Sequence, residues 1–182
     1  MSCLTNDREG QFHLRESSTK KGKEKILYQK IPKTGYVERD LLANYYLSLE
    51  TIVIRKESLL ELDYWFDKDF NVIEEYDLLI RISFKWKLSY VNQILAKWRI
   101  HSSSLTWTRP ELFFIEKEEM IEKYKMLFKD FELYYKEEID SVKLNINLEK
   151  SLLLWKNKQS YKSRDILKKY KSHSPKFFIF YY

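Results

Sequence analysis

The chain has 182 residues, of which 44% are hydrophobic and 33% are charged, so it can bury one ordinary core and is too apolar for a disordered protein. Its net charge of +6 would suit an anionic partner, but 33 basic residues are interleaved with 27 acidic ones, which favours solvated helix faces over a nucleic-acid site. The single cysteine excludes a disulfide framework within the chain and fits a reducing cytoplasm.

Membrane insertion is not expected from the hydropathy pattern. Residues 1–10 lack the apolar stretch of a signal peptide, and no apolar run approaches the roughly 20 residues that span a bilayer. The aromatic run at residues 177–182 suits a membrane interface. We therefore expect a cytoplasmic protein, with peripheral contact at the inner face of the membrane as an open alternative.

The first half of the chain predicts short elements. We expect a strand at 11–15 that pairs with 24–30, a short helix at 37–45, a buried strand at 51–54 and a helical turn at 57–62. In the predicted helix, Leu41 and Leu42 form the buried face.

A second helix is predicted to begin near Glu74, because acidic residues in a first turn complement the helix dipole. One or two strands follow at 87–100, and a polar loop at 102–104. Pro110 then opens a helical region, since proline is favoured in the first turn of a helix.

Three helical segments are expected beyond Pro110. The first carries a stripe of Ile121, Tyr124, Phe128, Phe131 and Tyr135 at alternating steps of three and four residues. The others lie at about 148–157 and 161–170. The predicted fold class is thus α/β at residues 1–108, with a C-terminal helical region at 109–182.

Three short motifs occur in order within the first part. The first comprises Leu41-Leu42-Ala43-Asn44, then Thr51 to Lys56, and then Tyr64-Trp65-Phe66-Asp67. The second is Glu74-Glu75-Tyr76-Asp77-Leu78 followed by Arg81. The third runs from Tyr90-Val91 to Trp98-Arg99-Ile100-His101, with Ser104 and Thr106 after it.

Together these motifs resemble the second, acceptor-side half of the GT-A catalytic domain in family 2 glycosyltransferases. The resemblance covers about residues 36–107. It implies a partial GT-A domain at 1–108 and an inverting transfer of a sugar, of the hexosyltransferase type, from a nucleotide-sugar to a glycan acceptor. Bacterial polysaccharide biosynthesis is the setting that this family suggests.

The resemblance places the catalytic base at Glu75. An inverting transfer needs a base to take the proton of the acceptor hydroxyl as that hydroxyl attacks the anomeric carbon. The family has aspartate at this position, so Glu75 lengthens the side chain by one methylene, and a displacement on the order of 1 Å can cost about a hundredfold in rate. Glu74 and Asp77 are rival candidates, and all three acids could instead only complement the helix dipole.

The third motif supplies the remaining candidates. The resemblance places His101 beside a divalent metal, Mn²⁺ or Mg²⁺, that is bound to the diphosphate, and a neutral imidazole is a good ligand for such ions. Arg99 would support phosphate or the acidic helix, and Arg81 is a further substrate-binding candidate. Trp98 and Trp107 could stack on a sugar ring, although core packing explains them equally well.

The family's nucleotide-binding half, with its βαβ unit and DxD motif, has no counterpart before residue 36. Asp67-Lys68-Asp69 has the DxD spelling but precedes the acidic helix, so we expect it to form a turn. The resemblance therefore implies an enzyme that is incomplete alone, with the nucleotide half as a separate partner or lost.

Two other functions fit parts of the sequence. A non-enzymatic adaptor would use an apolar face on residues 111–170 as its partner surface. Nucleic-acid binding would use the basic and aromatic residues, but no recognition motif accompanies them, so no specific nucleic-acid partner is expected.

Overall fold

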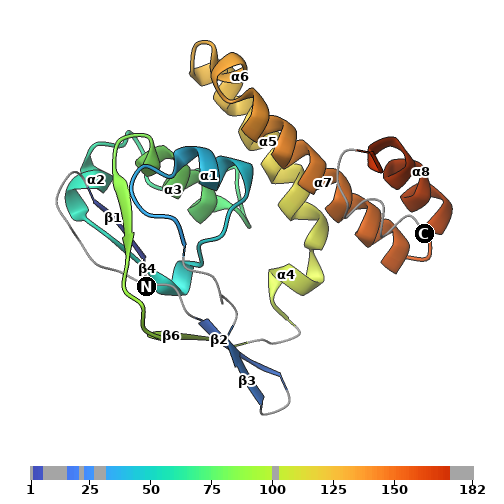
Figure 1. The fold of residues 1–182 in the computed structure, drawn as a ribbon, viewed down its shortest axis with the longest axis horizontal. Helices are drawn as coiled ribbons and strands as arrows, with labels where there is room; N and C mark the ends of the chain where they lie inside the picture. The colour runs from blue at the N-terminus through green and yellow to red at the C-terminus, as the bar shows by residue number, and fades with distance from the viewer. Residues whose placement is uncertain (1, 6–15, 21–22, 27–31, 100–102, 173–182) are drawn as a thin grey trace. The chain divides into compact units, whose positions relative to one another are not determined.

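The structure is a computed structural model, which describes residues 2–5, 16–20, 23–26, 32–99 and 103–172 (Figure 1). It divides into two compact units, residues 1–108 and 109–182. The boundary falls after Thr108, where the sequence analysis also divides the chain. The chain is mainly helical, with short strands in the first unit and a helical second unit.

A small sheet joins distant segments of the first unit. Strand β1 (Ser2–Thr5) lies between β4 (Ile52–Ile54) and β5 (Lys87–Tyr90), parallel to β4 and antiparallel to β5. Because β4 is at the edge of the three described strands, its residues are half-buried, whereas the sequence predicted a buried strand. Thr51 belongs to a 3₁₀ turn, η1 (Leu49–Thr51), rather than to the predicted strand.

Gly35 adds an isolated bridge to β5. Its N–H donates to the Leu88 carbonyl at 2.8 Å, and the Leu88 N–H donates to the Gly35 carbonyl at 2.7 Å. Gly35 has a φ of +90°, a conformation that side chains rarely adopt, so glycine is needed where the chain enters this bridge.

A second sheet consists of β2 (Glu16–Lys20), β3 (Lys23–Ile26) and β6 (Ala96–Arg99). Strands β2 and β3 form an antiparallel hairpin, and β6 pairs in parallel with β2. The predicted strand at 11–15 lies outside the described residues. The segment predicted to pair with it instead forms β3, which begins at Lys23 and pairs with β2.

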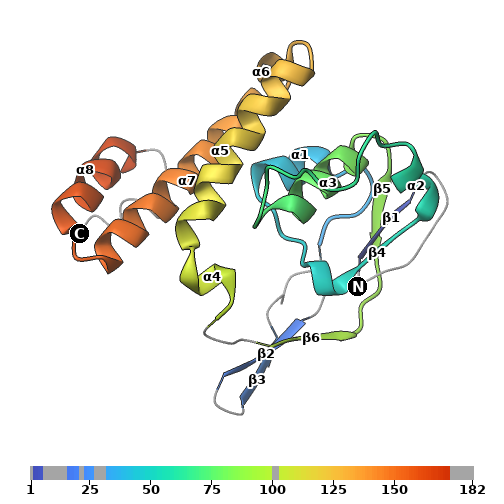
Figure 2. The same ribbon diagram turned by 180° about the vertical axis from the view of Figure 1, so that it is seen from behind.

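Two helices of the first unit pack together, as both views show (Figure 1 and Figure 2). Helix α1 (Glu38–Ala43) buries Leu41 and Leu42, as predicted. Helix α3 (Glu74–Ser83) begins at the predicted residue. The Tyr76 hydroxyl of α3 lies 3.0 Å from the carbonyl oxygens of both Leu41 and Leu42, so it provides a hydrogen-bond donor to the buried last turn of α1.

The remaining elements of this unit are short. Helix α2 (Lys56–Leu60) corresponds to the predicted helical turn, and α4 (Leu105–Thr108) ends the unit. A loop at 61–73 connects α2 to α3 and carries the Phe66-Asp67 motif.

The second unit is a helical hairpin with one further helix. Helix α5 (Pro110–Leu127) has Pro110 in its first turn, as predicted. Helix α7 (Lys136–Lys156) runs antiparallel to α5. The chain turns back near residue 130, and Lys117, well before the turn, pairs at 2.8 Å with Glu149, well after it. Helix α8 (Ser160–Tyr170) matches the third predicted helix.

The predicted continuous helix through Tyr135 is wrong. Helix α5 ends at Leu127, and Asp130 adopts a left-handed backbone with φ of 60° before the short α6 (Phe131–Tyr134). The chain then starts α7 at Lys136 instead of at Leu148. Neither glycine nor proline occurs at this turn, and the apolar spacing continues across it. The sequence therefore contains no signal that the helix ends at Leu127.

The aromatic residues of that stripe nevertheless pack together at the turn. The Phe131 ring lies 5.5 Å from Tyr124 and 6.1 Å from Phe128. A core of Met120, Ile121, Tyr124, Phe131, Ile139, Val142 and Ile146 forms between α5 and α7. Leu148 and Leu167 form a smaller cluster between α7 and α8. Among the described residues, no helix is both long enough and apolar enough to cross a membrane.

Candidate functional site

The acidic first turn of α3 does not hold three equivalent carboxylates. Asp77 has no exposed surface, and its Oδ2 accepts hydrogen bonds from the Arg81 Nε at 2.9 Å and pairs with Nη2 at 2.8 Å. Arg81 in turn donates to the carbonyl oxygens of Tyr64 at 2.7 Å and Trp65 at 2.6 Å. We call this arrangement the Asp77–Arg81 clamp.

The clamp changes two predictions about site residues. The Asp77 carboxylate is sealed from solvent and bonded to Arg81, which leaves it no path to an acceptor hydroxyl. The Arg81 side chain is only 9% exposed, and its donors hold the loop before α3 instead of facing a substrate. Both residues therefore hold the loop in place.

Glu74 and Glu75 remain as acids with partial exposure. The Oε2 atom of Glu74 is buried and has no hydrogen-bond partner among the described residues. Because a helix turns by about 100° per residue, Glu74 lies on nearly the same face as Arg81, and Glu75 lies on the adjacent face. The two glutamates thus point in different directions from one helix turn.

The third motif is only partly described. His101 lies outside the described residues, as do the side chains of Trp98 and Arg99. Their backbones belong to β6, opposite Ser18 and Thr19 of β2. Trp107 lies on α4 with 48% of its surface exposed.

Asp67 and Asp69 form the turn that the sequence predicts. The Asp67 Oδ1 accepts the Asp69 N–H at 3.0 Å, and the Asp67 carbonyl accepts the Phe70 N–H at 3.3 Å. Within the described ranges, no cluster of three or more histidine, cysteine, aspartate or glutamate side chains could hold a metal ion.

Three consecutive aromatic residues lie in the loop before α3 and are partly exposed. Tyr64, Trp65 and Phe66 are 36%, 48% and 53% exposed. The Trp65 Nε1 donates to the Leu59 carbonyl at 3.1 Å, and the Arg81 guanidinium lies 4.2 Å from the centre of the Tyr64 ring. We call residues 64–66 the aromatic loop. The signal in the sequence is a run of three rings between two aspartates.

A half-buried tyrosine, Tyr46, follows α1 in the chain, and its hydroxyl oxygen is buried. Burial raises the pKa of Tyr46, and the charge of Asp40 raises it further. The Tyr46 hydroxyl finds no hydrogen-bond partner in the described part of the chain, so it is kept protonated without a specific bond.

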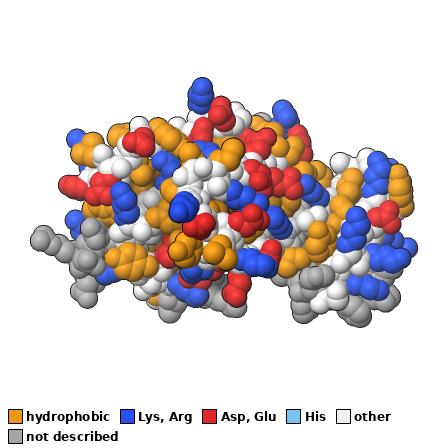
Figure 3. All heavy atoms as spheres, turned by 90° about the horizontal axis from the view of Figure 1, so that it is seen from above, with side chains coloured by type: hydrophobic (Ala, Val, Ile, Leu, Met, Phe, Trp, Pro, Cys, Tyr) orange, Lys and Arg blue, Asp and Glu red, His pale blue; other side chains and the backbone are white. Residues whose placement is uncertain are grey.

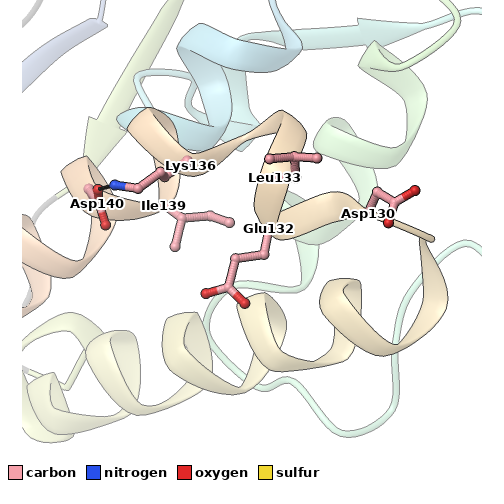
Figure 4. Close-up of a pocket in the computed structure, with 6 residues that line it drawn as sticks. All are labelled: Asp130, Glu132, Leu133, Lys136, Ile139 and Asp140. Atoms are coloured by element: carbon pink, nitrogen blue, oxygen red, sulfur yellow. Dashed lines mark hydrogen bonds and ion pairs between the residues drawn. The ribbon is translucent and has the colours of Figure 1, made fainter.

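A pocket of about 520 Å³ lies where α6 meets α7 (Figure 4). Its lining residues are Asp130, Glu132, Leu133, Lys136, Ile139 and Asp140. The Lys136 Nζ lies 2.7 Å from Asp140, a contact that lowers the pKa of Asp140 and raises that of Lys136. Glu132 pairs with Lys125 at 3.1 Å. Figure 4 shows Asp130 and Glu132 pointing in different directions, so the charged groups do not converge on one point.

Basic and acidic side chains are interspersed on the face shown in Figure 3. This agrees with the expectation of solvated helix faces. Comparison of the chain with models of protein families, with curated proteins and with solved structures finds no match.

Proposed function

We propose that this chain supplies the acceptor-side half of an inverting, GT-A (family 2-like) glycosyltransferase. The reaction would transfer a sugar from a nucleotide-sugar donor to a glycan or polysaccharide acceptor in the cytoplasm, with the inner face of the membrane as an alternative location. The finer fold assignment belongs to this proposal: β4, α3, β5 and β6 would be the second half of a GT-A domain.

The observation that carries the proposal is the position of Glu74 and Glu75. Both lie in the first turn of α3, directly after the loop with the Phe66-Asp67 motif, and both keep some solvent exposure. The Thr51 to Lys56 motif occupies β4 and the residues around it, and Tyr90 ends β5. The order of these motifs along the chain supports the proposal, although Thr51 lies in η1 and Lys56 begins α2.

The proposed chemistry uses one glutamate as base. As the acceptor oxygen forms its bond to the anomeric carbon, its proton passes to the carboxylate, and the bond between that carbon and the nucleotide diphosphate breaks. Glu75 is the position that the resemblance favours, and Glu74 is its rival. Asp77 is no longer a rival, because Arg81 binds its carboxylate.

The donor side is assigned to polypeptide outside these 182 residues, as a separate chain or as part of a longer one. A divalent ion would neutralise the leaving diphosphate when bound, and His101 is the proposed ligand from this chain. The described residues offer no carboxylate cluster for such an ion, so its acidic ligands would belong to the nucleotide-binding half.

The test is replacement of the gene in its native host, with the host's surface glycans as the readout. Glu75→Gln keeps the size of the side chain and removes its basicity, so we expect glycan synthesis to fall by about 10²–10⁴-fold. Glu137→Gln is the matched control, since Glu137 is an exposed acid in the first turn of α7. Full synthesis in both Glu74→Gln and Glu75→Gln would overturn the proposal.

A second candidate, a non-enzymatic adaptor, is favoured by one observation. Met126, Leu127, Leu133 and Tyr134 are 59–81% exposed around the turn between α5 and α6. An adaptor would lose its function in the same host when Met126 and Leu133 are changed to aspartate, and it would tolerate Glu75→Gln. The enzyme would show the opposite pattern. Leu60→Asp, at another exposed leucine, controls for added charge.

A further inference from the structure

We propose that the aromatic loop, Tyr64-Trp65-Phe66, is a binding surface for the sugar rings of a glycan chain. Its identification as the acceptor subsite rests on the proposed function. The binding chemistry itself rests on the exposure, rigidity and charge of the loop.

The loop is held in place by bonds to its backbone and to the edge of the Trp65 ring, while Arg81 lies over the Tyr64 ring. The Trp65 and Phe66 side chains keep 48% and 53% of their surface exposed. Arg81 fixes the carbonyl groups of Tyr64 and Trp65, and the buried Asp77 fixes Arg81. The indole N–H of Trp65 is bonded to the Leu59 carbonyl of α2. A surface that is ordered before binding loses little conformational entropy when a ligand arrives.

Half-exposed aromatic rings on a fixed loop suit a pyranose. The C–H face of a sugar packs against the face of an aromatic ring, while the sugar hydroxyl groups stay in water or bond to nearby polar groups. Phe66 is the most exposed of the three residues, and as a phenylalanine it offers only an apolar face.

The charge around the loop favours a neutral hydroxylated ligand. Asp63, Asp67 and Asp69 flank the rings in the sequence, with Lys68 as the one cation among residues 63–69. Arg81 also lies near the Tyr64 ring, but its charge is paired with Asp77. Such a surface repels phospholipid headgroups and nucleic-acid phosphates. Carboxylates can instead accept hydrogen bonds from sugar hydroxyls.

The size of the patch also argues against a protein partner. Three half-exposed aromatic side chains, each with about 150–250 Å² of surface, present less than half of the ~800 Å² that a stable interface buries on each partner. A chain of sugars needs only a narrow strip of this kind.

The loop lies on the face of α3 that carries a candidate base. Arg81, which holds the loop, follows Glu74 by seven residues, so the two side chains share a face and lie about 10 Å apart along the axis. A glycan that lies across the loop and continues along this face of α3 would reach its first turn. This geometry favours Glu74 over Glu75 as the acid that such a chain would meet.

The experiment is an NMR titration of the purified full-length chain with neutral hexasaccharides: cellohexaose, maltohexaose, laminarihexaose and chitohexaose. We expect at least one to shift the Trp65 indole signal. Trp65→Ala and Phe66→Ala should each weaken binding about tenfold, and Trp65→Tyr should restore most of it. Trp155→Ala is the matched control, because Trp155 is a tryptophan of α7 that is 68% exposed and belongs to no candidate site.

The outcomes separate this inference from the proposed function. The inference is overturned if no hexasaccharide binds, or if both loop variants bind as tightly as the parent chain and the Trp155→Ala control. If the loop variants lose binding while Glu74→Gln and Glu75→Gln cells make normal glycan, the loop is a sugar-binding surface without the enzyme. If those cells lose their glycan but the loop variants bind normally, the glycosyltransferase proposal is supported and sugar binding by the aromatic loop is rejected.

Discussion

Asp77 and Arg81 show how a residue in a catalytic motif can serve the fold. Asp77 lies in an acidic cluster, which made it a candidate base, but it is the most buried acid of that cluster. Its carboxylate, Arg81 and two backbone carbonyls form one network that ties the aromatic loop to α3. Sequence spacing of four residues suggests such an ion pair, yet burial decides that the pair is structural.

Removal of Asp77 should therefore destabilise the protein. Asp77→Ala leaves the Arg81 guanidinium nearly buried without its counter-charge, and we expect a loss of about 3–5 kcal/mol in the free energy of unfolding. Urea denaturation with an unchanged m value measures this loss. The exposed Lys136–Asp140 pair is the control: Asp140→Ala should leave the urea midpoint near that of the parent. Equal stability of both variants would contradict the clamp.

Tyr46 predicts a pH dependence. Because its pKa is raised in the folded state, the unfolded chain ionises first as the pH rises above the ordinary tyrosine value near 10. The folded state binds its proton longer, so stability is present below that pH and is lost as the pH rises above it. Tyr46→Phe should flatten this alkaline decline in urea midpoint. Tyr134→Phe, at an exposed tyrosine, should keep it.

The burial of single residues could be predicted from the sequence where it depends on local pattern, and could not where it depends on contacts with distant residues. Leu41 and Leu42 are buried as expected, because apolar residues on a short helix have few alternatives. The ring contacts and exposure of Tyr64 to Phe66 were not foreseen, since an aromatic run fits a core equally well. Their exposure follows from backbone bonds made by Arg81, a residue 16 or 17 positions away.

At the scale of elements, the boundaries of helices and strands could be predicted only where the local sequence marks them. Helices α3 and α5 begin where acids and a proline mark their first turns. The turn at Asp130 carries no such mark, so the predicted helix continued from α5 through α6 to Tyr135, and the start of α7 was predicted too late, at Leu148. Strand β2 is polar, Glu16-Ser17-Ser18-Thr19-Lys20, and forms through pairing with β3 and β6, which no periodicity reveals.

The bridge at Gly35 provides a test of an element boundary. A Cβ at Gly35 would meet no atom within 4 Å, so the cost of Gly35→Ala comes from its φ of +90° alone. We expect a loss of about 1–2 kcal/mol in the free energy of unfolding, and a smaller loss for Gly35→Asn, because asparagine tolerates positive φ better. Thermal or urea denaturation measures the order of stability of the parent protein and the two variants. A Gly35→Ala variant at least as stable as the parent protein would show that residue 35 does not adopt a positive φ in this bridge.

At the scale of the whole molecule, the two units have separate cores. The second unit buries residues of α5, α6 and α7 against one another and packs α8 onto α7. We expect residues 109–182 to fold alone, with helical circular dichroism and a cooperative thermal transition. Ile146→Ala, at a residue with no exposed surface, should cost about 2–5 kcal/mol there, whereas the exposed Leu133→Ala should cost little. A fragment without helical signal would contradict an independent core.

The central claim is that an acid of the α3 first turn and the imidazole of His101 share one site. The most direct test is NMR of the imidazole signals, with His13 and His173 as internal references. We predict that Glu75→Gln or Glu74→Gln shifts the His101 signals and leaves the other two unchanged, while Glu137→Gln shifts none of them. If His101 gives the same signals in both α3 variants and in the parent protein, the acid and the imidazole are apart, and the glycosyltransferase assignment fails.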